Sequence, residues 1–288
     1  MTRKTFDFVV IGAGSFGAWT AHELLRADHT VLLLDAYGPA HSRASSGGES
    51  RVIRMGYGRD ELYTRWSMRS LQRWKALADQ VGKPIFVETG MLWLVGAGDT
   101  IVRETQQTLA RVGIEQRRYS PAEIADRFPQ IYTGDLEWGL WEPGSGVLMA
   151  RQSIQALVAD GIRQGLDYRT ASIASPAATG RIDRIVTNSG EPISAGAFVF
   201  ACGAWLPKVF PALLGQRIFP TRQEIFFVAP PPGDTSFGAA SMPVWLHQPD
   251  LFYGIPDLEN RGFKISLDRH GPPIDPESAD RAPSVEGL

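Results

Sequence analysis

Three glycines and one aspartate near the N-terminus have the types and the spacing that phosphate and ribose binding require. Gly12, Gly14 and Gly17 form a G-x-G-x-x-G motif. In this motif the first glycine permits a tight turn, the second lets the backbone approach a pyrophosphate, and the third allows a helix to pack closely on a strand. Asp35 follows Gly17 by 18 residues, near the spacing of a carboxylate that binds the ribose 2′-hydroxyl. The pattern predicts a dinucleotide site.

The segments around the motif have the periodicity that such a site needs. Phe6–Ile11 is a short apolar run rich in β-branched residues, which is typical of a buried parallel strand. Ser15–Ala27 has apolar side chains at helical spacing, and Thr30–Leu34 is a second buried strand that ends at Asp35. The order predicts a βαβ unit with the glycine turn at the N-terminus of its helix, where free N–H groups favour an anion.

The residues alone do not decide which dinucleotide binds. An acidic residue at the end of the second strand favours a free ribose 2′-hydroxyl, and therefore FAD or NAD over NADP. The chain then enters a loop over 36–58 that is rich in Gly, Ser and Arg, instead of continuing with the βα units of an NAD domain. Later, the apolar run from Phe198 meets a glycine turn at Gly203. This junction is either a second cofactor-contacting element or an ordinary strand–helix connection.

Composition excludes several classes of protein. Of the 288 residues 43% are hydrophobic and 21% charged, which excludes a disordered or collagen-like chain. A formal net charge of −2 argues against general nucleic-acid binding. The single cysteine, Cys202, can form no internal disulfide and no cysteine-rich zinc site, so we expect no metal and a reducing, cytoplasmic location. No uncharged apolar run reaches the ~18 residues of a membrane helix, so we expect no membrane contact.

The remaining chain predicts a mixture of helices and strands. Ser120–Glu123 is a capping box with proline at the first helical position. Ile85–Val95 has the pattern of paired strands that turn near Gly90. A helix is expected over Gly203–Leu214 and a strand over Arg217–Val228, whereas Gly271–Leu288 has four prolines and no periodicity and is expected to be a loop.

Seven segments, in a fixed order, carry a resemblance to one family. They are VVIGAGSFG, LLLDAYGPAHSRASSGGESRVIRMGYG, WEPGSGVL, FACGAW, PTRQE, FYGIP and GFKISLD. In this order they resemble the monomeric sarcosine oxidases and N-methyl amino acid oxidases of the D-amino-acid oxidase superfamily, from about residue 6 to about residue 275. The resemblance implies an α/β fold: a discontinuous Rossmann-like FAD-binding domain (1–84 and 146–216) and an α+β substrate domain on a mainly antiparallel sheet (85–145 and 217–288).

The resemblance also implies which residues hold FAD. The pyrophosphate would lie over Gly12, Gly14, Ser15 and Gly17, and the adenosine ribose on Asp35. The loop that carries Arg43, Ser45, Ser46 and Arg51 would wrap the middle of the cofactor. Ile173 would lie beside the adenine, and Cys202, Gly203 and Trp205 would flank the cofactor again. Cys202 does not match the family's flavin-linking cysteine, so non-covalent FAD is expected.

Four residues match the family's catalytic positions. Arg54 matches the arginine that binds the substrate carboxylate, and a planar guanidinium can do so bidentately. Arg51 matches a basic residue near the flavin ring, and Tyr253 an active-site tyrosine. Lys264 matches the lysine that assists the reaction of reduced flavin with O2, where a buried ammonium would stabilise developing negative charge.

The implied activity is oxidation of the C–N bond of an amino acid-like secondary amine or a D-amino acid. The imine would then be hydrolysed, and O2 or another acceptor would reoxidise the flavin. The sequence departs from the family at Ser46 and Gly47, where the oxidases carry two histidines, and at Asp268, where they carry another. It also lacks the family's later segment, so a C-terminally truncated chain is expected. Two alternatives remain open: a non-catalytic FAD-binding remnant and an NAD-dependent dehydrogenase.

Overall fold

The computed structural model describes residues 5–176 and 180–282, and these divide into two compact units. The first unit comprises the described parts of Met1–Glu49, Ala150–Thr221 and Pro273–Arg281. The second comprises the described parts of Ser50–Met149, Arg222–Pro272 and Ala282–Leu288. Among the described residues, none of the helices is long and apolar enough to cross a membrane.

The first unit is built on a five-stranded sheet in the order β10-β11-β1-β2-β9, within the described residues. The strands β11, β1, β2 and β9 are parallel, and β10 runs antiparallel to β11. Their bounds are β1 Phe6–Ile11, β2 Val31–Asp35, β9 Asp167–Thr170, β10 Arg184–Val186 and β11 Pro192–Phe200. The predicted βαβ unit is therefore confirmed, with α1 (Ser15–Arg26) between β1 and β2.

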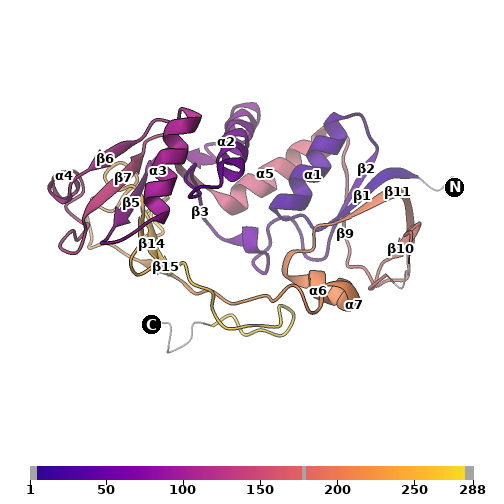
Figure 1. Cartoon of the computed structure of the whole chain (residues 1–288). Coiled ribbons are helices and arrows are strands. Elements are labelled where there is room, and N and C mark those ends of the chain that lie inside the picture. Colours follow the sequence, from indigo (N-terminus) through magenta and orange to yellow (C-terminus); the bar gives the residue numbers. More distant parts are fainter. Residues whose placement is uncertain (1–4, 177–179, 283–288) are drawn as a thin grey trace. The chain divides into compact units, whose positions relative to one another are not determined.

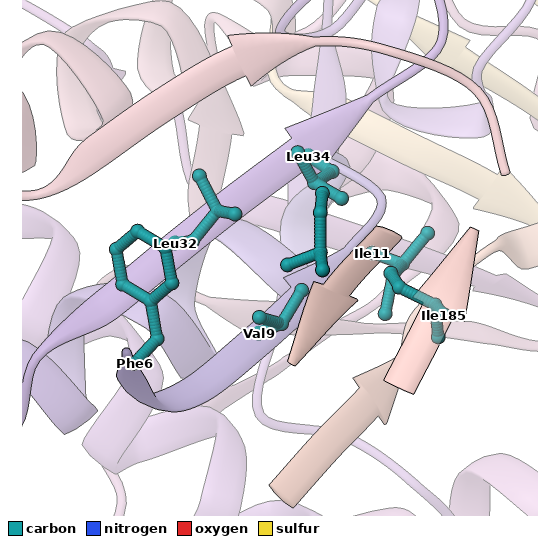
Figure 2. Packing of buried hydrophobic residues seen from close by; sticks show 7 residues of the cluster. Phe6, Val9, Ile11, Leu32, Leu34 and Ile185 are labelled. Carbon is teal, nitrogen blue, oxygen red and sulfur yellow. The ribbon is translucent and has the colours of Figure 1, made fainter. Parts of the chain in front are cut away.

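Both faces of this sheet are buried, as the apolar runs of β1 and β2 require. One face carries a cluster that includes the side chains labelled in Figure 2, namely Phe6, Val9, Ile11, Leu32, Leu34 and Ile185. Val10 and Leu33, which alternate with that face, are also fully buried. Helix α1 contacts both β1 and β2, and α5 (Ala150–Arg163) lies beside it (Figure 1). The sheet thus holds the end of β1, where the glycine turn begins, in a rigid frame.

The second unit contains a mainly antiparallel seven-stranded sheet, in the order β12-β15-β14-β13-β5-β7-β6 within its described residues. Only the pair β13–β5 among these neighbours is parallel. The bounds are β5 Met91–Val95, β6 Arg117–Tyr119, β7 Trp138–Glu142, β12 Ile225–Val228, β13 Val244–His247, β14 Phe252–Ile255 and β15 Phe263–Leu267. The α/β fold with an antiparallel substrate-type sheet is as predicted.

Within its described residues, a small second sheet and three helices complete this unit. The sheet has the order β3-β8-β4, with β3 at Arg51–Ile53, β8 at Gly146–Leu148 and β4 at Phe86–Val87. The helices are α2 (Glu61–Val81), α3 (Ile101–Val112) and α4 (Pro121–Arg127). The predicted capping box begins α4: Ser120 accepts from the Glu123 amide, and the Glu123 side chain accepts from the Ser120 amide.

The observed units differ from the predicted domain boundaries. Residues 50–84 and 146–149 were predicted in the FAD-binding domain but lie in the second unit. Residues 217–221 and 273–281 were predicted in the substrate domain but lie in the first unit. The physical reason for the first difference is strand pairing, because β3 pairs antiparallel with β8, and β8 with β4. That pairing joins segments far apart in the sequence, so it cannot be predicted from the local pattern of residues.

Two local predictions also need correction. Gly90 does not turn a hairpin, because β4 pairs with β8 whereas β5 pairs with β7 and β13. Its φ of +71° and the Trp141 ring, 1.8 Å from where a Cβ would lie, explain the glycine. The helix expected over Gly203–Leu214 is divided into η2 (Gly203–Trp205), α6 (Leu206–Val209) and α7 (Pro211–Leu214), since prolines interrupt it.

Replacing Leu92 in the second unit's core should test the packing of its sheet. Leu92 on β5 is fully buried in a cluster with Leu94 and Ile124. Leu92→Ala is expected to lower the free energy of unfolding by about 2–5 kcal/mol, because it removes methyl groups and leaves a cavity. Urea unfolding followed by tryptophan fluorescence measures the loss. Leu62→Ala, at a residue 56% exposed, is the control, and equal losses in the two variants would contradict the assignment of the core.

Candidate functional site

The glycine turn after β1 is shaped by close packing at two of its glycines. Gly12 has a φ of +109°, and a Cβ there would lie 2.3 Å from the Ala201 carbonyl oxygen. A Cβ on Gly17 would lie 1.8 Å from the Gly12 carbonyl oxygen. Real Cβ atoms do not approach backbone this closely, so the fold itself requires both glycines. They allow the end of β1, the residues after β11 and the start of α1 to meet.

Gly14 differs because the protein does not fill the space beside it. Its backbone is ordinary extended chain, with φ −80° and ψ −173°. The nearest atom to an added Cβ is the Ser46 hydroxyl oxygen at 3.2 Å, on a side chain that can rotate. Since packing does not demand glycine here, the missing side chain leaves room for a group from outside the chain.

The start of α1 offers the donors that such a group would need. Within the described chain, Gly14 provides no side-chain cap for α1, and the first turn contains no acidic residue. Ser15 is exposed, and the Phe16 side chain is 87% exposed. The first-turn N–H groups and the positive end of the helix dipole therefore suit an anion. The N–H groups at the start of α1 and the open space at Gly14 together suit the pyrophosphate of a dinucleotide.

Asp35 ends β2 and ties this turn to the loop that follows. Its buried carboxylate accepts backbone N–H bonds from Ala13 at 2.7 Å, Tyr37 at 2.8 Å and Gly38 at 2.9 Å. A carboxylate can accept about four hydrogen bonds, so these three leave capacity for a ribose hydroxyl. The residue that was predicted as a ribose ligand is thus also a structural link between two turns.

The loop after β2 is fixed by polar contacts of its own. Arg43 donates from Nη1 to the Tyr37 hydroxyl at 3.1 Å, and its guanidinium lies 4.8 Å from the centre of that ring. Ser45 and Ser46 form the short helix η1 with Gly47. Arg151, at the start of α5, donates from Nη2 to the Gly47 carbonyl at 2.7 Å. The structure therefore brings Ser46 of this loop to the glycine turn.

The segment after β11 lies against the same part of the first unit. The Cys202 thiol donates to the Ile11 carbonyl at 3.6 Å, and burial, with a smaller effect of the Asp35 charge, raises the pKa of Cys202 to about 12. The thiol is therefore neutral and unreactive near neutral pH. Ile173 forms an isolated bridge with Thr187 and packs on the hydrophobic cluster of the sheet.

Glu277 was missed in the sequence because it lies in a proline-rich stretch without periodicity. Its carboxylate accepts from Trp205 Nε1 at 2.8 Å and from the Tyr37 hydroxyl at 3.3 Å. It thereby links the second glycine element, which begins at Gly203, to the loop that contains Arg43. Only the neighbouring Asp-Pro and acidic residues hint at a fixed segment, and they do not identify its partners.

In the second unit, two cationic side chains converge on one carbonyl oxygen. Arg51 Nη1 donates to the Ser50 carbonyl at 3.0 Å, and Lys264 Nζ donates to the same oxygen at 3.1 Å. Lys264 lies on β15 and is 2% exposed. Its ammonium is 5.7 Å from the centre of the Tyr253 ring on the neighbouring strand β14. The structure thus brings three of the four predicted catalytic residues together.

This environment changes the acidity of Lys264. Burial, followed by repulsion from the Arg51 charge, lowers the pKa of Lys264 to about 7. Both effects disfavour the protonated amine, because it loses water and faces a like charge. Near neutral pH, Lys264 can therefore either hold or release a proton at Nζ. Perturbed acidity of this kind is common among residues that take part in chemistry.

Arg54 follows β3 and is held by aromatic rings. Its guanidinium lies 4.8 Å from the centre of the Trp93 ring and 5.4 Å from that of Tyr57. Its Nε donates to the Gly56 carbonyl at 3.3 Å, and the Ser67 hydroxyl donates to the Arg54 carbonyl. Within the described chain, Nε is the donor through which the guanidinium bonds the protein. The two terminal NH2 groups are left for a bidentate acceptor such as a carboxylate.

Comparison with known proteins shows the family and the fold of the chain. A family model described as "DAO: FAD dependent oxidoreductase" matches residues 7–283. The peroxisomal sarcosine oxidase of Homo sapiens is 31% identical, over 96% of this chain and 72% of its own. Monomeric sarcosine oxidase of Bacillus sp. (strain NS-129) is 28% identical, with the same coverage. The fold also matches a solved L-proline dehydrogenase from P. horikoshii, with a TM-score of 0.82 and 19% identity over 99% of this chain and 74% of that one.

The family model covers most of the chain, and its description names the cofactor and the class of reaction. The alternative of an NAD-dependent dehydrogenase is thereby set aside. The chain belongs to the DAO family of FAD-dependent oxidoreductases.

Proposed function

We propose that this chain oxidises the C–N bond of an amino acid-like secondary amine or a D-amino acid. The observation that carries the proposal is the Arg54 guanidinium, which is packed on Trp93 with its terminal NH2 groups left for a carboxylate. The names of the two sarcosine oxidases fit this substrate class, because sarcosine has a secondary amine next to a carboxylate. The amine would lose two electrons to become an imine, which water hydrolyses.

FAD, when bound without a covalent link, supplies the electron-accepting centre, and O2 or another acceptor takes the electrons from it. Room at Gly14 and the N–H groups at the start of α1 support binding of its pyrophosphate there. We assign the ribose to Asp35. The other proposed cofactor residues of the first unit are Gly12, Ser15, Gly17, Arg43, Ser45, Ser46, Ile173, Cys202, Gly203 and Trp205.

The second unit's polar residues have complementary proposed roles. Arg54 binds and orients the substrate carboxylate, so that the amine presents a fixed C–N bond. Arg51 keeps a permanent positive charge, since a guanidinium does not lose its proton in proteins. Lys264 holds or releases a proton at Nζ near neutral pH, because burial and Arg51 lower its pKa to about 7. Tyr253 lies beside the Lys264 ammonium.

Arg54→Gln should selectively impair carboxylate-bearing substrates. Each hydrogen bond between the guanidinium and a carboxylate contributes about 1.5–3 kcal/mol, so kcat/KM is expected to fall by about 10- to 150-fold. The measurement is anaerobic bleaching of the FAD-loaded protein, and then steady-state rates, with N-methylglycine, N-methyl-L-tryptophan, L-proline and D-amino acids. Arg69→Gln, on the exposed face of α2, is the matched control. No bleaching with any amine would favour the non-catalytic remnant instead.

Gly14→Ala should weaken FAD binding without disturbing the FAD-free fold. A Cβ at this position meets only a rotatable hydroxyl, so the melting temperature of the FAD-free protein is expected to change little. FAD affinity should fall at least about tenfold, because the methyl group occupies the space that the pyrophosphate needs. Fluorescence titration with FAD measures this. Gly17→Ala, where the Cβ meets backbone, should instead destabilise the fold. Unchanged FAD affinity in Gly14→Ala would place the pyrophosphate elsewhere.

Lys264→Met should remove a pH dependence of stability. The pKa of Lys264 is about 7 in the folded state and near its ordinary 10.5 when unfolded. Between these values the unfolded chain binds the proton and the folded chain does not, so the wild type gains stability as pH rises. Relative to wild type, the variant should therefore lose up to about 1.4 kcal/mol per pH unit between pH 7 and 10.

Urea unfolding of the FAD-free proteins at a series of pH values measures this difference. Below about pH 7, Lys264 is protonated in both states, and the two stability curves should run parallel. Lys83→Met, at an exposed lysine, is the control and should follow the wild type throughout. Parallel curves for Lys264→Met up to pH 10 would show that the lysine is not held in a desolvated site.

A further inference from the structure

The Trp93 indole, on which the Arg54 guanidinium packs, is hydrogen-bonded to a buried carboxylate. The proposed function does not use this carboxylate. Glu142, at the end of β7, is 1% exposed. Its Oε1 accepts from Trp93 Nε1 at 2.6 Å. Its Oε2 accepts from the Met55 amide at 2.9 Å and from the Ser145 hydroxyl at 2.9 Å. Three donors from three parts of the second unit therefore meet at one carboxylate.

Two of these donors determine where Arg54 lies. Trp93 supplies the ring over which the guanidinium packs, at 4.8 Å from the ring centre. Met55 is the next residue in the chain, and its backbone carries Arg54. The Thr64 hydroxyl donates to the Met55 carbonyl at 2.8 Å, so both sides of that residue are fixed. Glu142 thus joins the support under the guanidinium to the backbone from which the side chain extends.

The chain passes Glu142 closely at Gly56, the residue after Met55. A Cβ on Gly56 would lie 2.6 Å from Thr105 Cγ2, 2.7 Å from Glu142 Oε1 and 2.8 Å from Trp93 Cζ2, so a side chain there would displace buried neighbours. The Arg54 Nε also donates to the Gly56 carbonyl. The 54–56 segment is therefore shaped to the surface of the Glu142–Trp93 pair, and the arginine bonds back to that segment.

The charge of the carboxylate adds to this geometry. A hydrogen bond to a carboxylate is stronger than one to a neutral acceptor, and Trp93 Nε1 lies 2.6 Å from Glu142 Oε1. This hydrogen bond polarises the indole and increases the negative potential of its face, which attracts a cation. A carboxylate at this position therefore holds the ring and also strengthens its attraction for the guanidinium.

We infer that Glu142 is a positioning residue, which fixes the Arg54 guanidinium through the Trp93 ring and the Met55 amide. The inference rests on the proposed function, because it assigns a purpose to a fixed Arg54. It adds a residue that touches neither substrate nor cofactor. Without Glu142, the indole and the 54–56 segment lose their common acceptor, and the guanidinium should sample several orientations.

Glu142→Gln distinguishes the positioning of Arg54 by hydrogen bonds from a contribution of Glu142 to core packing. Trp93 and Met55 donate to different oxygens of Glu142. Glutamine keeps the shape of glutamate but replaces one of those oxygens with an NH2 group, so one of the two hydrogen bonds is lost. Ser145→Ala is the matched control, because it removes the third donor and leaves the other two hydrogen bonds. Trp93→Phe is a second test that keeps a six-membered aromatic ring near Arg54 and removes the indole N–H together with the five-membered part of the ring.

The direct readout is the mobility of the Arg54 Nε–H group. In protein labelled with 15N-arginine and saturated with FAD, its NMR signal is assigned by its absence from Arg54→Gln. We expect a high heteronuclear NOE in the wild type and in Ser145→Ala, and a clearly lower value in Glu142→Gln and Trp93→Phe. An unchanged NOE in both Glu142→Gln and Trp93→Phe would overturn the inference.

The second readout is the preference for a carboxylate over a carboxamide. The fastest substrate among N-methylglycine, N-methyl-L-tryptophan and L-proline is compared with its amide. In Glu142→Gln, KM for the carboxylate should rise at least about tenfold, as for a lost hydrogen bond to a charged group, while kcat and the amide's KM change little. An equal loss for both substrates would mean a merely structural role and would overturn the inference.

These measurements separate the inference from the proposed function. If Arg54→Gln abolishes the carboxylate preference while Glu142→Gln changes neither readout, the inference falls and the proposed function stands. If Arg54→Gln keeps the preference but Glu142→Gln frees the Arg54 Nε–H group, the positioning stands and the substrate assignment falls.

Discussion

Two ionisable side chains in the second unit are removed from water and hydrogen-bonded by uncharged groups. Lys264 donates to the Ser50 carbonyl, and Glu142 accepts from an indole, an amide and a hydroxyl. Burying a charge is costly unless fixed hydrogen bonds replace its hydration. The partners must therefore stay in place, and two of them, the Ser50 carbonyl and the Met55 amide, belong to the segment that carries Arg51 and Arg54. The arrangement of the proposed substrate-binding groups follows from this constraint.

The first unit uses the opposite arrangement at its glycine turn. Backbone N–H groups at the start of α1, rather than charged side chains, are left to bind an anion. The nearby carboxylate of Asp35 is already engaged by three backbone amides, which keep the turn in shape. A backbone site of this kind recognises a phosphate group without strong dependence on individual side chains. It therefore suits a cofactor that carries a pyrophosphate.

Local patterns in the sequence were enough to predict the parts of the fold that form locally. The βαβ unit and the capping box at Ser120 depend on residues within a few turns of each other, and both are confirmed. The pairing of β3 with β8 and the separation of β4 from β5 depend on distant segments, so the turn predicted at Gly90 was wrong. For the same reason the two compact units divide the chain at other residues than the predicted domains, which remain a prediction. Roles for Arg54 and Lys264 came from family resemblance and remain proposals.

Glu142 and Glu277 show why even a correct family assignment misses part of a site. Each lies next to a proline, and neither has a periodic or motif signal that names its partners. Glu142 makes its contacts across 49 and 87 residues, and Glu277 across 72 and 240. Such residues become visible only when the fold brings their partners together, because their role is to connect segments rather than to react.

The pairing of Arg51 with Lys264 also determines how the second unit responds to charge. Arg51 remains positive, whereas Lys264 changes its protonation near pH 7, so the pair carries one or two positive charges. A negative charge that arrives beside the pair favours the ammonium form and raises the pKa of Lys264. The proton that the lysine then takes up balances the new charge. On the proposed roles, this buried lysine beside a permanent cation would therefore take up a proton when a negative charge arrives.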